Sequence, residues 1–152
     1  MRSFVAGLAA GALLGAGATL GRGQWVAPPR PAYASAASVA DTLRDLGARN
    51  GNRPVLTLAP YIVLAEHRVA PRNSAESAYL HPGEAELYYV LAGAATLVTG
   101  VGGDTVHEGT ALHIARGDVV IIPEDTPHWF SAVDDSISYL SMKVPRGQPA
   151  RK

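Results

Sequence analysis

The feature that most constrains the fold is the period of the hydrophobic pattern, which changes to two from Arg53 onward. Alternating apolar and polar residues place one face of a strand toward a core, and Gly, Pro, Asn and Asp separate the runs. With no second helical pattern, roughly eight to ten short strands in series predict an all-β antiparallel barrel or sandwich. Gly93 and the glycines at 100, 102 and 103 are typical of hairpin turns.

Length and composition limit the alternatives. The 152 residues suffice for one domain with a sizeable core and are too few for two ordinary domains. The formal net charge is zero, so the sequence carries no electrostatic footprint of a nucleic-acid partner. The absence of cysteine excludes disulfides, thiol nucleophiles and thiolate metal sites, and it leaves histidine, aspartate, glutamate and tyrosine as metal ligands.

The N-terminal segment, residues 1–34, has the pattern of an export signal followed by a linker. Arg2 precedes an apolar run without charges from Phe4 to Leu20. Small-residue sites suited to a signal peptidase occur near Ala34, far beyond the apolar run. A cleaved signal is the favoured interpretation, and a retained membrane anchor and a cytosolic helix are the alternatives. We therefore expect an exported protein, periplasmic or extracellular, with any membrane contact made through this segment.

One short amphipathic helix is expected before the strands, within residues 35–52. Apolar residues repeat at helical spacing from Ser38 to Arg49, and Ser38 is the predicted N-cap. The barrel should then occupy residues 53–145. The polar residues 146–152 should form a flexible tail.

The stretch from Tyr79 to Gly93 carries the main functional signal. His81 stands five residues before Glu86, and the stretch has the layout of a strand, a tight turn and a second strand. That layout can aim an imidazole and a carboxylate from neighbouring strands at one point. A shared point for nitrogen and oxygen ligands is how a protein holds a metal ion.

This stretch resembles the first motif of the cupins, a family of small jelly-roll β-barrels. In that motif, two histidines one residue apart are followed by three or four residues, a glutamate, six residues and a glycine. His81 matches the second histidine, and Glu86 and Gly93 follow at the family's spacing.

The second cupin motif is a glycine, five residues, a proline, one residue, a glycine, two residues and a histidine. Gly117, Pro123 and His128 match that spacing, and Asp125 stands where the second glycine is usual. Aspartate also tolerates turn conformations. The resemblance covers roughly Val55 to Val144 and implies a cupin-like jelly-roll barrel.

The resemblance also implies a metal site of three histidines and one glutamate, but Tyr79 stands in place of the first histidine. His81, Glu86 and His128 still make a two-histidine, one-carboxylate set, suited to one divalent ion of iron, manganese, nickel or zinc. Strand alternation keeps Tyr79 on the face of His81. Three outcomes stay open: Tyr79 ligates the metal, it serves near the metal as a proton donor, or the site is too weak to hold a metal.

Alternation also selects residues beyond the metal set. Tyr88 shares a face with Glu86, and Phe130 shares one with His128, so Tyr88 and Phe130 are candidate substrate-binding residues. Plain core packing is the alternative for both. Arg68 would bind a substrate carboxylate if it pointed into the barrel, but a surface position is the favoured interpretation.

Together these features favour an exported metal-binding cupin that acts on an unidentified small molecule. Cupins with such sites include dioxygenases, isomerases and lyases. Of these, we favour dioxygenase-type oxidoreductase chemistry. The alternatives are a non-catalytic module that binds a small molecule and a barrel that has lost its metal. The resemblance further suggests a homodimer, with outward-facing Trp129 and Tyr89 at the contact.

Overall fold

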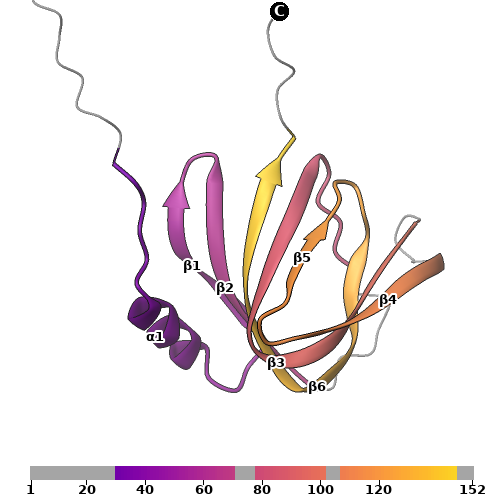
Figure 1. Cartoon of the computed structure of the whole chain (residues 1–152), viewed down its shortest axis with the longest axis horizontal. Coiled ribbons are helices and arrows are strands. Elements are labelled where there is room, and N and C mark those ends of the chain that lie inside the picture. The colour runs from indigo at the N-terminus through magenta and orange to yellow at the C-terminus, as the bar shows by residue number, and fades with distance from the viewer. Residues whose placement is uncertain (1–29, 71–77, 102–106, 147–152) are drawn as a thin grey trace, which may run out of the picture. The chain divides into compact units, whose positions relative to one another are not determined.

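A computed structural model describes residues 30–70, 78–101 and 107–146 (Figure 1). The apolar run of the predicted export signal lies outside the described residues, and so does the predicted tail beyond Arg146. From Pro31 onward the described residues belong to one compact unit. No helix in this described part of the chain is long and apolar enough to cross a membrane.

Six antiparallel strands make up the sheet in the described residues. They are β1 (Gly51–Leu58), β2 (Tyr61–Val69), β3 (Glu84–Val101), β4 (His107–Ala115), β5 (Val119–Ile122) and β6 (His128–Pro145). The strand order is β1-β2-β6-β3-β4, and β5 pairs with β3. The long strands β3 and β6 bend together, so the sheet wraps around an interior (Figure 1). The predicted all-β antiparallel barrel is confirmed.

Gly93 lies inside β3 and is not the hairpin turn that the sequence suggested. The pairing of β3 with β6 shifts register between Gly93 and Ala95, which marks a bulge. Gly93 has a φ of +73°, and a Cβ at this position would lie 1.8 Å from the carbonyl oxygen of Ser136. Only glycine fits where the strands bend, so one strand of 18 residues replaces two of the predicted short ones.

The second predicted hairpin agrees with the strand pairing. β3 pairs antiparallel with β4 from Ala94, opposite Ala115, to Val101, opposite His107. Gly102 and Gly103, which the sequence placed in this turn, lie outside the described residues.

The short helix α1 (Ala36–Leu46) begins and ends earlier than predicted. Its N-cap is Ser35, whose side chain accepts a hydrogen bond from the backbone N–H of Ser38 at 3.1 Å. It ends at Gly47, which has a φ of +61° and stops the helix before the predicted Arg49. The helix contacts β1 and β2, and its last residue is buried.

The barrel interior is divided into an apolar part and a polar part. The apolar part is a cluster of buried side chains from β3, β4, β5 and β6, including Val90, Ala95, Leu97, Ile114, Ile122, Val133 and Ile137. The polar part contains the buried side chains Glu66, Arg68, Glu86, His128 and Ser141. Because buried polar groups are costly unless they are partnered, this second part is where a functional site is expected.

Candidate metal centre

The turn before β3 holds His81 in place, and the second motif supports that turn. The backbone N–H of Glu84 donates to the carbonyl oxygen of His81 at 3.2 Å, and Gly83 between them has a φ of +71°. Asp125, which replaces the usual motif glycine, has a φ of +57°. Its carboxylate accepts a hydrogen bond from Gly83 N at 2.8 Å. The departure from the motif therefore ties the His81 turn to the segment that leads into His128.

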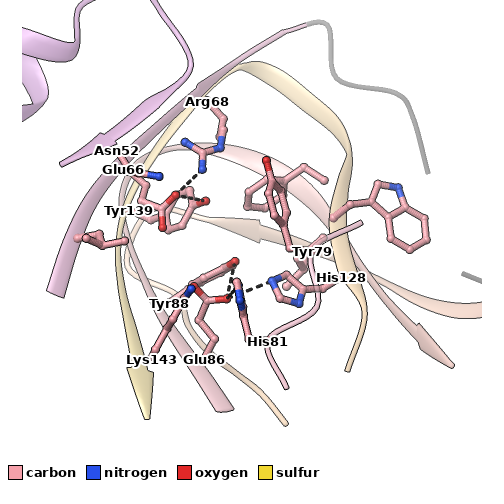
Figure 2. A pocket seen from close by; sticks show the side chains of 14 residues that line it. Asn52, Glu66, Arg68, Tyr79, His81, Glu86, Tyr88, His128, Tyr139 and Lys143 are labelled. Carbon is pink, nitrogen blue, oxygen red and sulfur yellow. Dashed lines mark hydrogen bonds and ion pairs between the residues drawn. The ribbon is translucent and has the colours of Figure 1, made fainter. Parts of the chain in front are cut away.

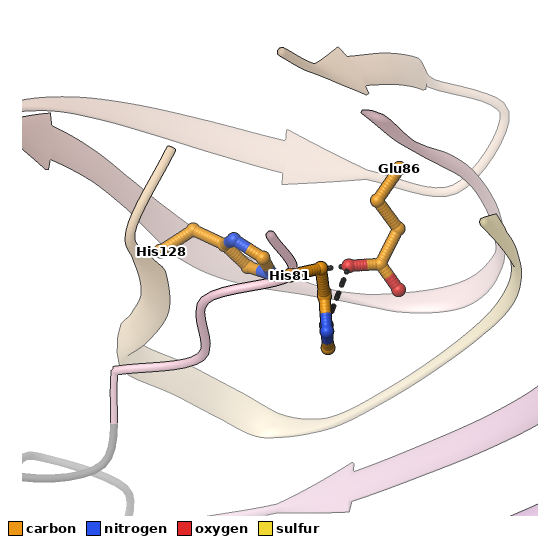
Figure 3. A group of neighbouring side chains, drawn as sticks. All are labelled: His81, Glu86 and His128. Atoms are coloured by element: carbon orange, nitrogen blue, oxygen red, sulfur yellow. Dashed lines mark ion pairs between the residues drawn. The ribbon is translucent and has the colours of Figure 1, made fainter. Parts of the chain in front are cut away.

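The structure brings His81, Glu86 and His128 together (Figure 3). One nitrogen or oxygen from each lies within 4.8 Å of the others. Glu86 Oε2 is 3.1 Å from His128 Nε2 and 3.4 Å from His81 Nε2. Ligand atoms bound at about 2.1 Å to one ion lie about 3.0 Å apart in cis octahedral positions and about 3.4 Å apart in tetrahedral ones. The two distances from the carboxylate to the imidazoles fit a single small divalent ion.

The hydrogen bonding of His128 supports the same interpretation. Its Nδ1 lies 3.0 Å from the backbone carbonyl oxygen of Thr126. Since a carbonyl only accepts, Nδ1 must carry the hydrogen, and in the neutral imidazole Nε2 then has a bare lone pair. That Nε2 is buried and has no hydrogen-bond partner among the described residues, even though Glu86 Oε2 is near. A cation between the two acceptors would satisfy both.

The charges favour the protonation states that bind metal. Burial raises the pKa of Glu86, but the neighbouring His128, His81 and Lys143 outweigh it, so the pKa lies below its ordinary value. Burial lowers the pKa of His81, and Glu86 offsets only part of that effect. An ionised carboxylate beside a neutral imidazole is the ligand state required for coordination.

Tyr88 and Phe130 both line the pocket in front of these ligands, and both are buried. Burial raises the pKa of Tyr88 well above its ordinary value, so its hydroxyl is a neutral donor. It donates to Glu86 Oε2 at 3.4 Å and so helps to orient that carboxylate. Substrate binding by Tyr88 and Phe130 stays a prediction.

Tyr79 also lines the pocket, and its backbone pairs with that of His128. The two N–H···O bonds of this bridge measure 2.8 and 3.0 Å, and the two rings lie 6.3 Å apart. In Figure 2 the Tyr79 hydroxyl lies on the side of the pocket that holds Arg68. Metal ligation by Tyr79 stays a prediction.

The pocket has a volume of about 220 Å³. Besides the end that holds His81, Glu86 and His128, it has a second polar end, formed by residues of β2 and β6 (Figure 2). There Glu66 accepts hydrogen bonds from Arg68, Ser141 and Tyr139, the last at 3.3 Å. The expectation that Arg68 is a surface residue is wrong, because its side chain is only 9% exposed. It points into the barrel because it alternates with outward-facing His67 on β2.

Among the pocket residues that sequence reasoning missed are three with titratable side chains, Glu66, Tyr139 and Lys143. Period-two alternation on β2 and β6 could have grouped them, had the register between the strands been known. Trp129, which we expected on the outer face, also lines the pocket. Tyr89 is exposed as expected, and the homodimer stays a prediction.

Residues 65–142, just over half of the chain, match the family model of the cupin domain. The chain belongs to the cupin family. No curated protein sequence gave a significant match.

Solved structures agree with a cupin fold. Protein BH2720 of Bacillus halodurans is 18% identical, with a TM-score of 0.60, over 82% of this chain and 89% of that one. A cupin protein of Bacteroides fragilis is 21% identical, with a TM-score of 0.52, over 69% of this chain and 85% of that one. The iron(II) form of HppE is 16% identical, with a TM-score of 0.51, over 61% of this chain and 48% of that one. At these identities the likeness establishes the fold.

Proposed function

We propose that this cupin is a metal-dependent enzyme that acts on a small molecule, with His81, Glu86 and His128 as the ligands of one divalent transition metal. The observation that carries the proposal is the buried Nε2 of His128, which has no hydrogen-bond partner among the described residues although a carboxylate oxygen lies 3.1 Å away. Leaving such a nitrogen unsatisfied costs free energy, and a metal ion removes that cost.

The chemistry we favour is oxygenase-type oxidation. A transition metal bound there would supply Lewis-acid or one-electron chemistry, and two histidines with one carboxylate leave further positions for ligands. The chain's own residues orient these groups: Thr126 fixes the His128 tautomer, and Tyr88 holds Glu86. Iron, manganese, nickel and zinc are the candidates, and iron is tested first because HppE, of similar fold, is known with iron(II).

Elemental analysis of the protein, purified without added metal, tests the site. We expect about one transition metal per chain, and we expect His81→Ala and His128→Ala to lose it while the barrel stays folded. His113→Ala is the matched control, because His113 pairs with Asp134 at 3.1 Å on the surface, away from the pocket. Full metal content in either ligand variant would remove the assignment.

A non-catalytic binding module is the second candidate. It is favoured by the pocket itself, a cavity of about 220 Å³ whose lining includes the aromatic side chains of Tyr88, Trp129 and Phe130 beside the polar groups. A small molecule that co-purifies, together with no oxygen consumption by the iron-loaded protein, would support this module over the oxygenase.

Export is also part of the proposal. It rests on Arg2, the apolar run from Phe4 to Leu20 and the small-residue sites near Ala34. Intact-mass analysis of the secreted or periplasmic fraction should show a chain that lacks about the first 34 residues. A full-length chain in the membrane fraction would indicate an anchor instead.

A further inference from the structure

The pocket contains two cationic side chains in very different situations. Arg68 forms an ion pair with Glu66, and its Nη1 donates to the carbonyl oxygens of Gly51 and His67 at 2.8 and 2.9 Å. A ligand anion at Arg68 would therefore have to compete with a buried carboxylate that is already in place. Arg68 is held by the protein and is a poor anion receptor.

Lys143 is the contrasting cation. It lies directly opposite Glu86 in the pairing of β3 with β6, so both side chains face the pocket. Its side chain lines the same pocket as the candidate metal ligands His81, Glu86 and His128. Yet it makes no ion pair with a described carboxylate. In Figure 2, Lys143 lies at the Glu86 end of the pocket, away from Arg68.

The overall charge of the pocket favours an anion once a metal is bound. Its charged lining residues are two carboxylates, Glu66 and Glu86, and two cations, Arg68 and Lys143, so the side chains cancel. A divalent ion leaves the site with a net charge of about +2, concentrated at the Glu86 end. An anionic ligand at that end neutralises charge that the protein leaves uncompensated.

We propose that Lys143 is the anion-recognition residue of this pocket and that the ligand is a small organic acid whose anionic oxygen group binds beside Lys143 and the metal centre. The inference rests on the proposed metal function and assigns its substrate class. The aromatic side chains Trp129 and Phe130 supply apolar surface for the organic part of such an acid.

Titration of the cobalt(II)-loaded protein with acetate and with imidazole tests this inference through the visible absorption of the cobalt. Acetate is the anionic probe, and imidazole is a neutral metal ligand. In Lys143→Met, which keeps the length of the side chain and removes the charge, the acetate Kd should rise about 3- to 10-fold. The imidazole Kd should stay within about twofold, because no charge is recognised.

Lys143→Arg is the matched control and should keep most of the acetate affinity, since it retains the charge. The acetate effect of Lys143→Met should shrink as salt is raised. An unchanged acetate Kd in a fully cobalt-loaded Lys143→Met would overturn this inference and leave the metal assignment intact. Equal weakening of acetate and imidazole would also overturn it, because the residue would then act on the metal. Failure of the wild-type protein to take up cobalt would overturn the proposed function and this inference with it.

Discussion

Two carboxylates are buried in one pocket, and the protein completes the surroundings of only one of them. Glu66 accepts from an arginine, a serine and a tyrosine, and each of its two oxygens accepts at least one hydrogen bond. Glu86 receives one long hydrogen bond, of 3.4 Å from Tyr88, and its Oε2 faces two imidazole nitrogens. One of those nitrogens, His128 Nε2, has no hydrogen-bond partner in the described part of the chain.

The difference separates structural polarity from functional polarity. A buried charge is tolerated where the fold supplies an opposite charge and enough donors, as at Glu66. At Glu86 the cost of burying a charge is offset only in part. The carboxylate oxygen and the two imidazole nitrogens converge on a point that a cation would fill. We therefore infer that the Glu66 end stabilises the fold and that the Glu86 end holds the proposed metal ion.

The largest expected effect comes from removing the counter-charge of Glu66. Arg68→Met leaves Glu66 buried without its counter-charge, and we expect the free energy of unfolding of the metal-free protein to fall by about 3–5 kcal/mol. Urea unfolding followed by circular dichroism measures the change. The double variant Glu66→Gln, Arg68→Met should recover part of the loss. A loss below about 1 kcal/mol for Arg68→Met would mean that the pair does not stabilise the fold.

The second-largest expected effect concerns the Glu86 end of the pocket and depends on the metal. Zinc at 100 times its Kd should stabilise the wild-type protein by about 2.7 kcal/mol, and excess chelator should reverse the gain. Glu86→Gln should abolish this response while changing the stability of the metal-free protein by less than about 1 kcal/mol. Glu66→Gln is the matched control: it should be less stable but still respond to zinc. Thermal unfolding with and without zinc compares the three proteins.

Sequence alone predicted the Glu86 end better than the Glu66 end, and the reason is the distance along the chain. His81 and Glu86 are separated by one turn, so their spacing carries the signal, and a second motif supplies His128. Glu66, in contrast, meets Tyr139 and Ser141 across 73 and 75 residues. Such contacts depend on the register of β2 with β6, which no local pattern specifies.

The pattern of polar and apolar residues on β6 also made it hard to predict which face of the strand points into the barrel. Tyr139, Ser141 and Lys143 alternate with Leu140 and Met142. The usual rule places the apolar set inside and the polar set in solvent, yet here Tyr139 and Lys143 line the pocket and Ser141 is buried against Glu66. The strand type was predictable from the alternation, but which face points inward was not. Lys143 had one further signal, since the chain has only one other lysine, Lys152.

Tyr88→Phe tests the contribution of the Tyr88 hydroxyl, the hydrogen-bond donor to Glu86 found among the described residues. Removal of the hydroxyl frees Glu86 to rotate, and we expect the metal Kd to rise about 10-fold, the lower end of the usual range because the bond is long. Competition with a chromophoric zinc indicator measures the Kd. An unchanged Kd would show that the two histidines alone hold the carboxylate in position.

The smallest effect is expected from Tyr139→Phe, which removes a tyrosine hydroxyl that donates to Glu66. Tyr88 and Tyr139 are a close comparison: their rings lie 4.6 Å apart, both are buried, and burial raises the pKa of each well above its ordinary value. They differ in the carboxylate to which they donate.

Tyr139→Phe removes one of three donors to Glu66, so the free energy of unfolding should fall by about 1 kcal/mol and the metal Kd should not change. A shift in the metal Kd as large as that of Tyr88→Phe would show that the two ends of the pocket are coupled, and the separation of structural from functional polarity would fail.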